Sequence, residues 1–515
     1  MSEMGDIANI DGKRVAKNTL VLYVRMIIML VISFFTARVT LNALGVTDYG
    51  INNVVGGLVS MFSLLSNSLS SSTSRFMTFG LGEGDMDKLK RIFSTSVNIH
   101  IILAVVVVIA VETIGVWFLN HKMTIPPDRM EAANWVLQCS VVVFAVGLFS
   151  VPYNSAIIAH EKMSAFAYMT IFDAASRLLI IGGIYYYKGD KLILLALMTM
   201  VQSFIRQSIY WLYCKRKFEE CVYRIGWDKE LTRSMFGFAG WNFIGSTAGL
   251  MKDQGVNIAI NLFTGPAVNA ARGIAMQVNG IIGQFTSGFM TALNPQIIKG
   301  YAAGELASVH KLIYQGTRLS YYLFMFLSIP IFFEIEKILQ LWLGQVPDHT
   351  VLFARLALVL TLAEIISNAL ITAQGATGKI KNYQIVVGGI LLLNFPISYV
   401  LLKMGVFPEV TLVVAIVISQ ICLVARLWFL RSMIKLPVRE FIRRVYLNVL
   451  VVTFMAVVLP ALCYFFMEPS WLRLFVLGIV SIVSSACSIY YIGCGVEERV
   501  MVKVYMQKVH AADIS

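Results

Sequence analysis

Long apolar segments separated by short polar clusters repeat along the whole chain. Fourteen segments reach the roughly 20 residues that a helix needs to cross the hydrocarbon core of a bilayer. The strands of a closed barrel would instead alternate polar and apolar residues over about ten positions, and the sequence lacks that alternation. The pattern therefore predicts an all-α polytopic membrane protein. The predicted spans are 18–41, 51–73, 92–119, 132–158, 164–187, 192–213, 234–263, 272–293, 312–333, 350–373, 383–402, 409–430, 445–466 and 470–492.

Composition supports the same class. Hydrophobic residues make up 58% of the chain, charged residues only 14%, and the mean hydropathy is +0.74. These values exclude an ordinary soluble domain. The apolar run after the polar first 17 residues is too long for the core of a signal peptide, so we expect an uncleaved first helix.

Lysine and arginine placement predicts the topology, because short loops rich in these residues stay in the cytoplasm. With the N-terminus inside, the inner segments carry 26 of them and the outer loops carry 7. We therefore expect a multi-pass protein with both termini in the cytoplasm. The net charge of +13 follows from this bias, so no nucleic-acid partner is expected.

Two short matches indicate an internal repeat. Residues 73–78 (TSRFMT) match residues 286–291 (TSGFMT) at an offset of 213. At an offset of 214, three residues near the end of the fourth span (154, 157 and 159) are identical to residues 368, 371 and 373. A six-helix period is even, so both halves would enter the membrane in the same direction, as in parallel repeats that rock around a central site.

The repeat predicts two six-helix bundles in parallel pseudo-repeat and two further C-terminal helices. The predicted divisions are an N-terminal bundle at 1–213, a cytoplasmic linker at 214–233, a second bundle at 234–430, and two extra helices with a cytoplasmic tail at 431–515.

Several loop motifs resemble those of the bacterial polysaccharide (Wzx-type, O-antigen) flippases of the multidrug/oligosaccharidyl-lipid/polysaccharide (MOP) exporter superfamily. They are Ala37-Arg38 with residues 44–50 (LGVTDYG), the turn at 82–85 (GEGD), and residues 152–162. The resemblance covers most of the first twelve predicted helices and implies a MATE-like fold in a bacterial inner membrane. It also implies a polyprenyl-pyrophosphate-linked oligosaccharide as substrate, moved to the periplasmic leaflet for surface polysaccharide or lipopolysaccharide synthesis.

Basic residues inside the spans give a separate argument, because each costs roughly 2.5–3.5 kcal/mol near the bilayer centre. Arg25 and Arg38 lie within roughly 60° of one face of the first helix. Arginine suits phosphate oxygens and lysine offers a point charge. We therefore expect a cationic cavity that binds the pyrophosphate, lined by Arg25, Arg38, Arg177, Arg206 and Lys252.

Other charges in the spans leave alternatives open. Arg272, Arg318, Arg355 and Arg426 lie nearer the helix ends, where snorkelling or structural pairing is expected. Asp173 and Arg177 have the i, i+4 spacing of an ion pair within one helix. Glu364 has no basic residue nearby in the sequence. Asp173 and Glu364 either carry a coupling H⁺ or Na⁺ or serve as structural hydrogen-bond acceptors.

Two other functions remain as alternatives. A cation-coupled exporter of small molecules, of the multidrug type, would be expected to have more acidic residues in its cavity. A membrane glycan polymerase or glycosyltransferase would need a larger extramembrane site than these loops offer. No nucleotide-binding motif, paired catalytic carboxylates or metal-ligand cluster is evident. We therefore expect a non-enzyme without cofactor or metal, with the cargo and membrane lipid as its partners.

Overall fold

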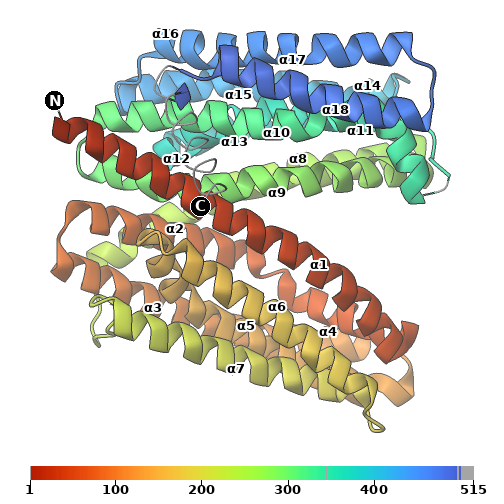
Figure 1. Cartoon of the computed structure of the whole chain (residues 1–515). Helices are drawn as coiled ribbons and strands as arrows, with labels where there is room; N and C mark the ends of the chain where they lie inside the picture. The colour runs from red at the N-terminus through yellow and green to blue at the C-terminus, as the bar shows by residue number, and fades with distance from the viewer. Residues whose placement is uncertain (1, 124, 344, 496–497, 500–515) are drawn as a thin grey trace, which may run out of the picture. The chain divides into compact units, whose positions relative to one another are not determined.

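The computed structural model describes residues 2–123, 125–343, 345–495 and 498–499, and within these ranges every regular element is a helix. Figure 1 shows their arrangement within each part of the chain. The first half contains α1 (Ser2–Ser60), α2 (Ser63–Glu83), α3 (Met86–Ala110), α4 (Val116–His121), α5 (Met130–Ala159), α6 (Met163–Tyr185), α7 (Lys191–Lys217) and α8 (Lys229–Thr264). The second half contains α9 (Pro266–Ala302), α10 (Leu306–Leu343), α11 (Thr350–Ile365), α12 (Asn368–Ala376), α13 (Lys381–Leu392), α14 (Asn394–Lys403), α15 (Val410–Met433), α16 (Val438–Phe441), α17 (Leu447–Phe466) and α18 (Trp471–Ser488).

The all-α prediction is confirmed. Within the described residues, nine helices are long and apolar enough to cross a membrane, or ten if the bent pair Thr47–Ser60 and Ser63–Glu83 forms one span. The prediction was about fourteen, so the count agrees only roughly. The four further predicted spans, 18–41, 234–263, 272–293 and 312–333, fall within the long helices α1, α8, α9 and α10.

The chain divides into two compact units. Unit 1 comprises Met1–Thr247 and Thr291–Glu305, and unit 2 comprises Ala248–Met290 and Leu306–Ser515. Helices α8 and α9 each begin in one unit and end in the other. The division of the sequence into bundles at 1–213 and 234–430 with a linker between them stays a prediction.

In unit 1, α5 packs against α7, α2 and α3, and α1 packs against α6. The core of this unit is apolar, with Phe93 and Leu137 fully buried. In unit 2, α11 packs against α15 and α10, and the α17–α18 pair packs against α10. Phe353 lies at the centre of one apolar cluster there.

Side-chain caps define several helix starts. Asp85 accepts a hydrogen bond from the Lys88 amide at the start of α3, and Asp190 accepts from the amides of Leu192 and Ile193 at the start of α7. These bonds satisfy backbone donors that a helix N-terminus leaves without partners.

The LGVTDYG motif has a structural role. Gly45 adopts φ 78°, ψ 172° and interrupts the helical backbone of α1, a conformation that glycine adopts without the steric cost of a Cβ. Three residues later, Asp48 forms a two-pronged ion pair with Arg129, with N···O distances of 2.8 and 2.6 Å. Arg129 also binds the Asp190 carboxylate at 2.6 Å. The motif thus joins the break in α1 to the starts of α5 and α7.

The C-terminal pair α17 and α18 is attached to α10 by a buried ion pair. Arg473 Nε donates to Glu334 Oε1 at 2.6 Å, and Nη2 donates to Oε2 at 3.2 Å. Four serines of α18 are buried within unit 2, and their small side chains permit close packing of the helices. They are Ser481, Ser484, Ser485 and Ser488.

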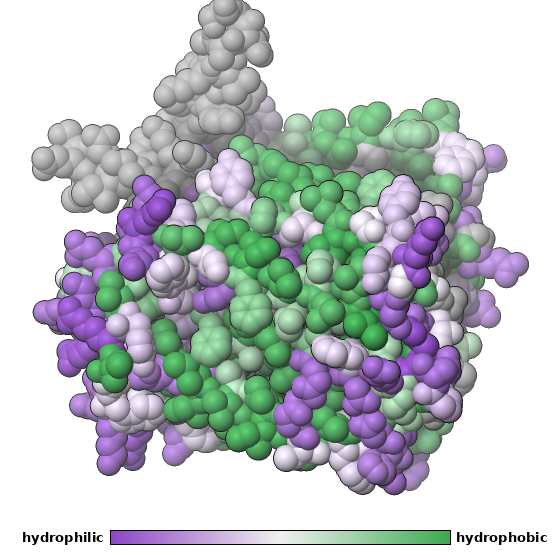
Figure 2. All heavy atoms as spheres, turned by 90° about the horizontal axis from the view of Figure 1, so that it is seen from below, coloured by the Kyte–Doolittle hydropathy of each residue, from purple (hydrophilic) through white to green (hydrophobic). Residues whose placement is uncertain are grey.

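Large apolar side chains remain exposed along many helices. Figure 2 shows apolar residues across the middle of one face and hydrophilic residues gathered toward its ends. An exposed surface of this kind suits hydrocarbon, because a bilayer core solvates apolar side chains. The chain is a multi-pass membrane protein.

Candidate functional site

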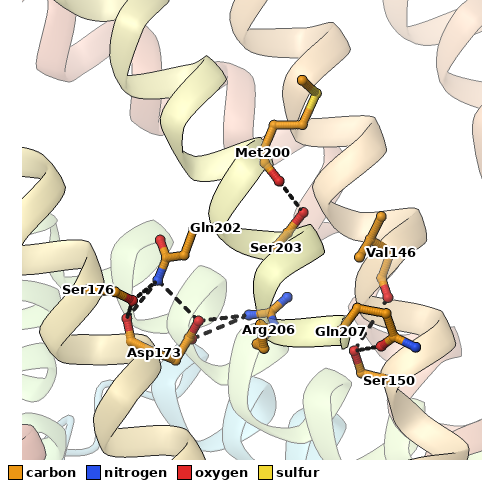
Figure 3. A network of polar contacts seen from close by, with 9 residues as sticks. All are labelled: Val146, Ser150, Asp173, Ser176, Met200, Gln202, Ser203, Arg206 and Gln207. Carbon is orange, nitrogen blue, oxygen red and sulfur yellow. Dashed lines mark hydrogen bonds and ion pairs between the residues drawn. The ribbon is translucent and has the colours of Figure 1, made fainter. Parts of the chain in front are cut away.

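Polar side chains of α6 and α7 form a network inside unit 1 (Figure 3). Arg206 Nη1 lies 3.4 and 3.3 Å from the two carboxylate oxygens of Asp173. Gln202 donates to the Asp173 carboxylate at 3.1 Å, to its backbone oxygen at 2.7 Å, and to the Ser176 hydroxyl at 2.8 Å. Gln202 and Arg206 are four residues apart and therefore share one face of α7, from which both reach α6.

Helix α5 borders this network. A Cβ added to Gly147 would lie 3.9 Å from Arg206 Nη2, so the guanidinium runs beside the α5 backbone at this position. One residue further along α7, the Gln207 amide oxygen accepts a 2.5 Å hydrogen bond from Ser150. Three helices therefore contribute polar groups at one level of the unit.

The structure corrects the expected partner of Asp173. The i, i+4 spacing favoured an ion pair with Arg177, whereas the ion pair formed is with Arg206. Arg177 is exposed, and no hydrogen bond or ion pair joins it to another described residue. The spacing rule considers neighbours on one helix only, and here a residue of the adjacent helix is the partner.

Two other predicted residues lie on α1. The Arg25 guanidinium stacks 4.7 Å above the Phe166 ring of α6, and its Nε is buried without a hydrogen-bond partner among the described residues. The side chain of Arg38 lies outside the described part of the structure.

Unit 2 contains a second charge pair. Lys252 of α8 is 8% exposed, and its Nζ lies 2.8 Å from Glu364 Oε1 of α11. Asp253 is the other carboxylate near this ammonium, at 4.0 Å. Glu364 lies at the end of α11, two residues before the break between α11 and α12, so this carboxylate occupies an interrupted helix.

The remaining basic residues have structural partners, as the snorkelling or pairing alternative expected. Arg426 donates to Tyr383 at 2.9 Å and to Ser367 at 3.0 Å, and Arg272 donates to Asn257. Arg318 pairs with Glu498 at 2.6 Å. Arg355 donates to the backbone oxygen of Phe332 at 3.1 Å.

Gln202, Ser176 and Ser367 belong to these networks, and the sequence interpretation did not select them. Gln202 could have been selected from the sequence, because it precedes Arg206 by one helical turn and therefore shares its face of the helix. Ser176 and Ser367 had none, because serine is also common at packed helix interfaces.

Each unit thus places a carboxylate next to a basic side chain within the membrane-spanning region. Such a pair is electrically neutral, which lowers the cost of placing both charges in a low-dielectric environment. Protonation of the carboxylate, or its capture by Na⁺, would release the basic partner. The arrangement can therefore exchange the basic side chain for another cation as the counter-ion of the carboxylate.

The sequence comparisons give limited matches. No protein-family model matches the sequence. A probable multidrug resistance protein NorM of Agrobacterium fabrum is 31% identical over 140 residues. That match covers 26% of this chain and only 29% of the length of the relative.

Solved structures match over much more of the chain. A MATE crystal structure in the straight conformation has a TM-score of 0.71 at 12% identity, covering 82% of this chain and 96% of that one. An outward-facing multidrug resistance MATE transporter of the MOP superfamily has a TM-score of 0.68 at 13% identity, with the same coverage. A MOP superfamily transporter from Pyrococcus furiosus, whose binding pocket is described as having reverse polarity, has a TM-score of 0.66 at 13% identity and again covers 82% and 96%. The chain therefore has a MATE-like fold.

Proposed function

We propose that this chain is a cation-coupled exporter that works by alternating access. The observation that carries the proposal is the carboxylate paired with a basic side chain in each unit, Asp173 with Arg206 and Glu364 with Lys252. The MATE-like fold and the partial match to NorM support an exporter of small molecules. They favour it over the lipid-linked oligosaccharide flippase that the sequence motifs suggested.

The paired charges also change the argument against a small-molecule exporter. A small-molecule exporter would be expected to have more acidic residues in its cavity, whereas the sequence places Arg206 and Lys252 among the residues of a predicted cationic cavity. Their partners neutralise much of that charge in the protein, and H⁺ or Na⁺ uptake at the carboxylates would free the basic groups during the transport cycle. Coupling then consists of a competition between the internal basic residue and the external cation for one carboxylate.

Reconstituted full-length chain tests the proposal. We expect an imposed proton or sodium gradient to drive transport of a cationic dye such as ethidium across proteoliposomes. Asp173→Asn and Glu364→Gln should each lower gradient-driven transport at least tenfold. Glu112→Gln is the matched control, because Glu112 also lies within a predicted span but its hydrogen bond is to Gln138, at 3.1 Å.

Two results would contradict the proposal. If both carboxamide variants keep full gradient dependence, the two pairs do not couple transport. If the intact chain moves no cationic dye under either gradient, the small-molecule cargo is wrong.

One observation supports the flippase as a second candidate function. Arg25 stacks on an aromatic ring, and Arg426 and Arg272 bond neutral groups, so these three guanidinium charges have no carboxylate at ion-pair distance among the described residues. Retained positive charge favours an anionic cargo such as a polyprenyl-pyrophosphate-linked oligosaccharide, and Arg25, Arg38, Arg177, Arg206 and Lys252 remain the proposed residues of its cationic site.

A deletion strain separates the two functions. Accumulation of a completed lipid-linked unit in the cytoplasmic leaflet, reversed by the intact gene, would support the flippase and identify the sugar. Normal surface polysaccharide without that accumulation would eliminate it. If Arg25→Ala, Arg177→Ala, Arg206→Ala and Lys252→Ala proteins all insert and still restore export, the cationic site is wrong.

A further inference from the structure

A cavity of about 930 Å³ lies in unit 2 where α15 ends and α17 begins. Three arginines line it: Arg431 from the last turn of α15, Arg439 from α16, and Arg443 from the π-helical turn Ile442–Tyr446. These arginines are part of the positive charge that predicts the topology, and the proposed transport site does not include them. They belong to the end of the helices that is predicted to face the cytoplasm.

The positive charge of this cavity is largely uncompensated. No carboxylate among the described residues lies within ion-pair distance of Arg431, Arg439 or Arg443. Glu440 also lines the cavity, but its carboxylate pairs with Arg444 at 3.6 Å. Three exposed arginines on three successive segments therefore line a common space. The planar guanidinium fork of arginine suits the oxygens of a phosphate group.

Apart from Glu440, the rest of the lining is apolar. Leu436, Ile442 and Leu447 contribute to it, and Ile442 and Leu447 are 42% and 51% exposed. A ligand that contacts both the arginines and the apolar residues of the cavity must carry an anionic group joined to hydrocarbon. A small inorganic anion would leave these apolar side chains uncovered.

Exposed apolar stripes lead away from the cavity along both neighbouring helices. On α15, Ile421, Val424 and Trp428 precede Arg431 at helical spacing and are 49%, 67% and 67% exposed. On α17, Leu447 is followed on one face by Val451 and Phe454, which are also exposed. Trp428 lies one turn from the arginine, the position that tryptophan favours at a membrane interface.

From this arrangement we propose that the cavity binds an anionic membrane phospholipid. The phosphate group is held by Arg431, Arg439 and Arg443, and the acyl chains lie along the apolar stripes of α15 and α17. Basic pockets between helices on the cytoplasmic side are suited to anionic lipid headgroups. This site is separate from the proposed transport function and does not depend on it.

Native mass spectrometry of the purified full-length chain tests the site, with phosphatidylglycerol and zwitterionic phosphatidylcholine as matched probes. We expect phosphatidylglycerol to bind more tightly, and a triple Arg431→Gln, Arg439→Gln, Arg443→Gln variant to lose its affinity by about tenfold or more. The control triple replaces Lys215, Arg216 and Lys217 with glutamine. It removes the same charge at an exposed helix end in unit 1 and should retain the phosphatidylglycerol adducts.

Three further outcomes decide the proposal. Equal binding of the two lipids, or equal losses in the two triple variants, would overturn it. If the glutamine triple does not fold, the three single variants replace it, and each should lower the affinity by severalfold. Competition by farnesyl pyrophosphate against phosphatidylglycerol at the arginines would assign the cavity to an exported cargo instead of a resident lipid.

Discussion

Replacing Arg473 with methionine should destabilise the attachment of α17 and α18 to α10. The side chains of Arg473 and Glu334 are only 9% and 3% exposed, and their two hydrogen bonds measure 2.6 and 3.2 Å. Without the arginine, Glu334 would remain as a buried charge at the point where the backbone of α10 departs from helical geometry. Breaking a buried pair in this way costs about 3–5 kcal/mol.

The measurement is thermal unfolding of the purified protein in detergent, followed by tryptophan fluorescence. A loss of this size would lower Tm by roughly 6–20 °C if unit 2 follows the scaling of soluble domains of about 250 residues. The double variant Glu334→Gln, Arg473→Met removes both charges and should recover a large part of the loss, because no ion stays buried.

Arg444→Met provides the matched control. Its pair with Glu440 is solvent-exposed, at 64% and 50%, and exposed pairs contribute about 0–1 kcal/mol. A Tm for Arg473→Met that equals the wild-type value would refute the reasoning. A double variant as unstable as the single one would also refute it, since the loss would then come from packing and not from an uncompensated charge.

Three further predictions concern unit 1. The Arg129 guanidinium lowers the pKa of Asp190 below its usual value. This pair therefore stabilises the fold above about pH 4, and its contribution disappears as the pH falls through the lowered pKa. Asp190→Asn should lower Tm at pH 7, and a Tm difference from wild type that does not narrow at pH 3 would exclude this linkage. Gly45→Ala places a Cβ at φ 78°, ψ 172°, a region essentially restricted to glycine, and should cost about 1–3 kcal/mol in denaturant unfolding. Gly50→Ala, in open helical space, should not destabilise. Lys299→Met removes the 2.8 Å partner of Glu161, whose side chain is 4% exposed, and should lower Tm by more than Lys217→Met, which replaces an exposed lysine of the same unit. Equal shifts would contradict the pairing.

The sequence predicted the class and the approximate helix positions because those depend on local hydrophobicity. Every predicted span falls on one helix or on consecutive helices with a short break, since an apolar run of bilayer length has few other structures available to it. The long helices α8 and α9 are not among the nine apolar helices, because glycine, asparagine and glutamine along them lower their mean hydropathy. Topology from loop charge remains a prediction.

The partners of the intramembrane charges could not be predicted from the sequence. Lys252 and Glu364 are 112 positions apart, and no spacing rule relates residues on α8 and α11. Asp173 had two basic candidates as its partner, Arg177 and Arg206. The i, i+4 spacing rule selected Arg177, which lies on the same helix. Whether these residues bind cargo also remains a prediction, because that depends on side-chain geometry during transport.

Helices α8 and α9 each pass from one compact unit to the other without a break in the helix. A reorientation of the units must therefore strain two hydrogen-bonded rods, near residues 247–248 and 290–291, in addition to moving flexible loops. A bent rod stores elastic energy and returns it, so in the proposed alternating-access cycle the stiffness of these two helices would contribute to the balance between states. Gly249 offers a place to alter one of these helices, because a Cβ there meets no atom within 4 Å and alanine would stabilise the helical conformation by up to about 1 kcal/mol.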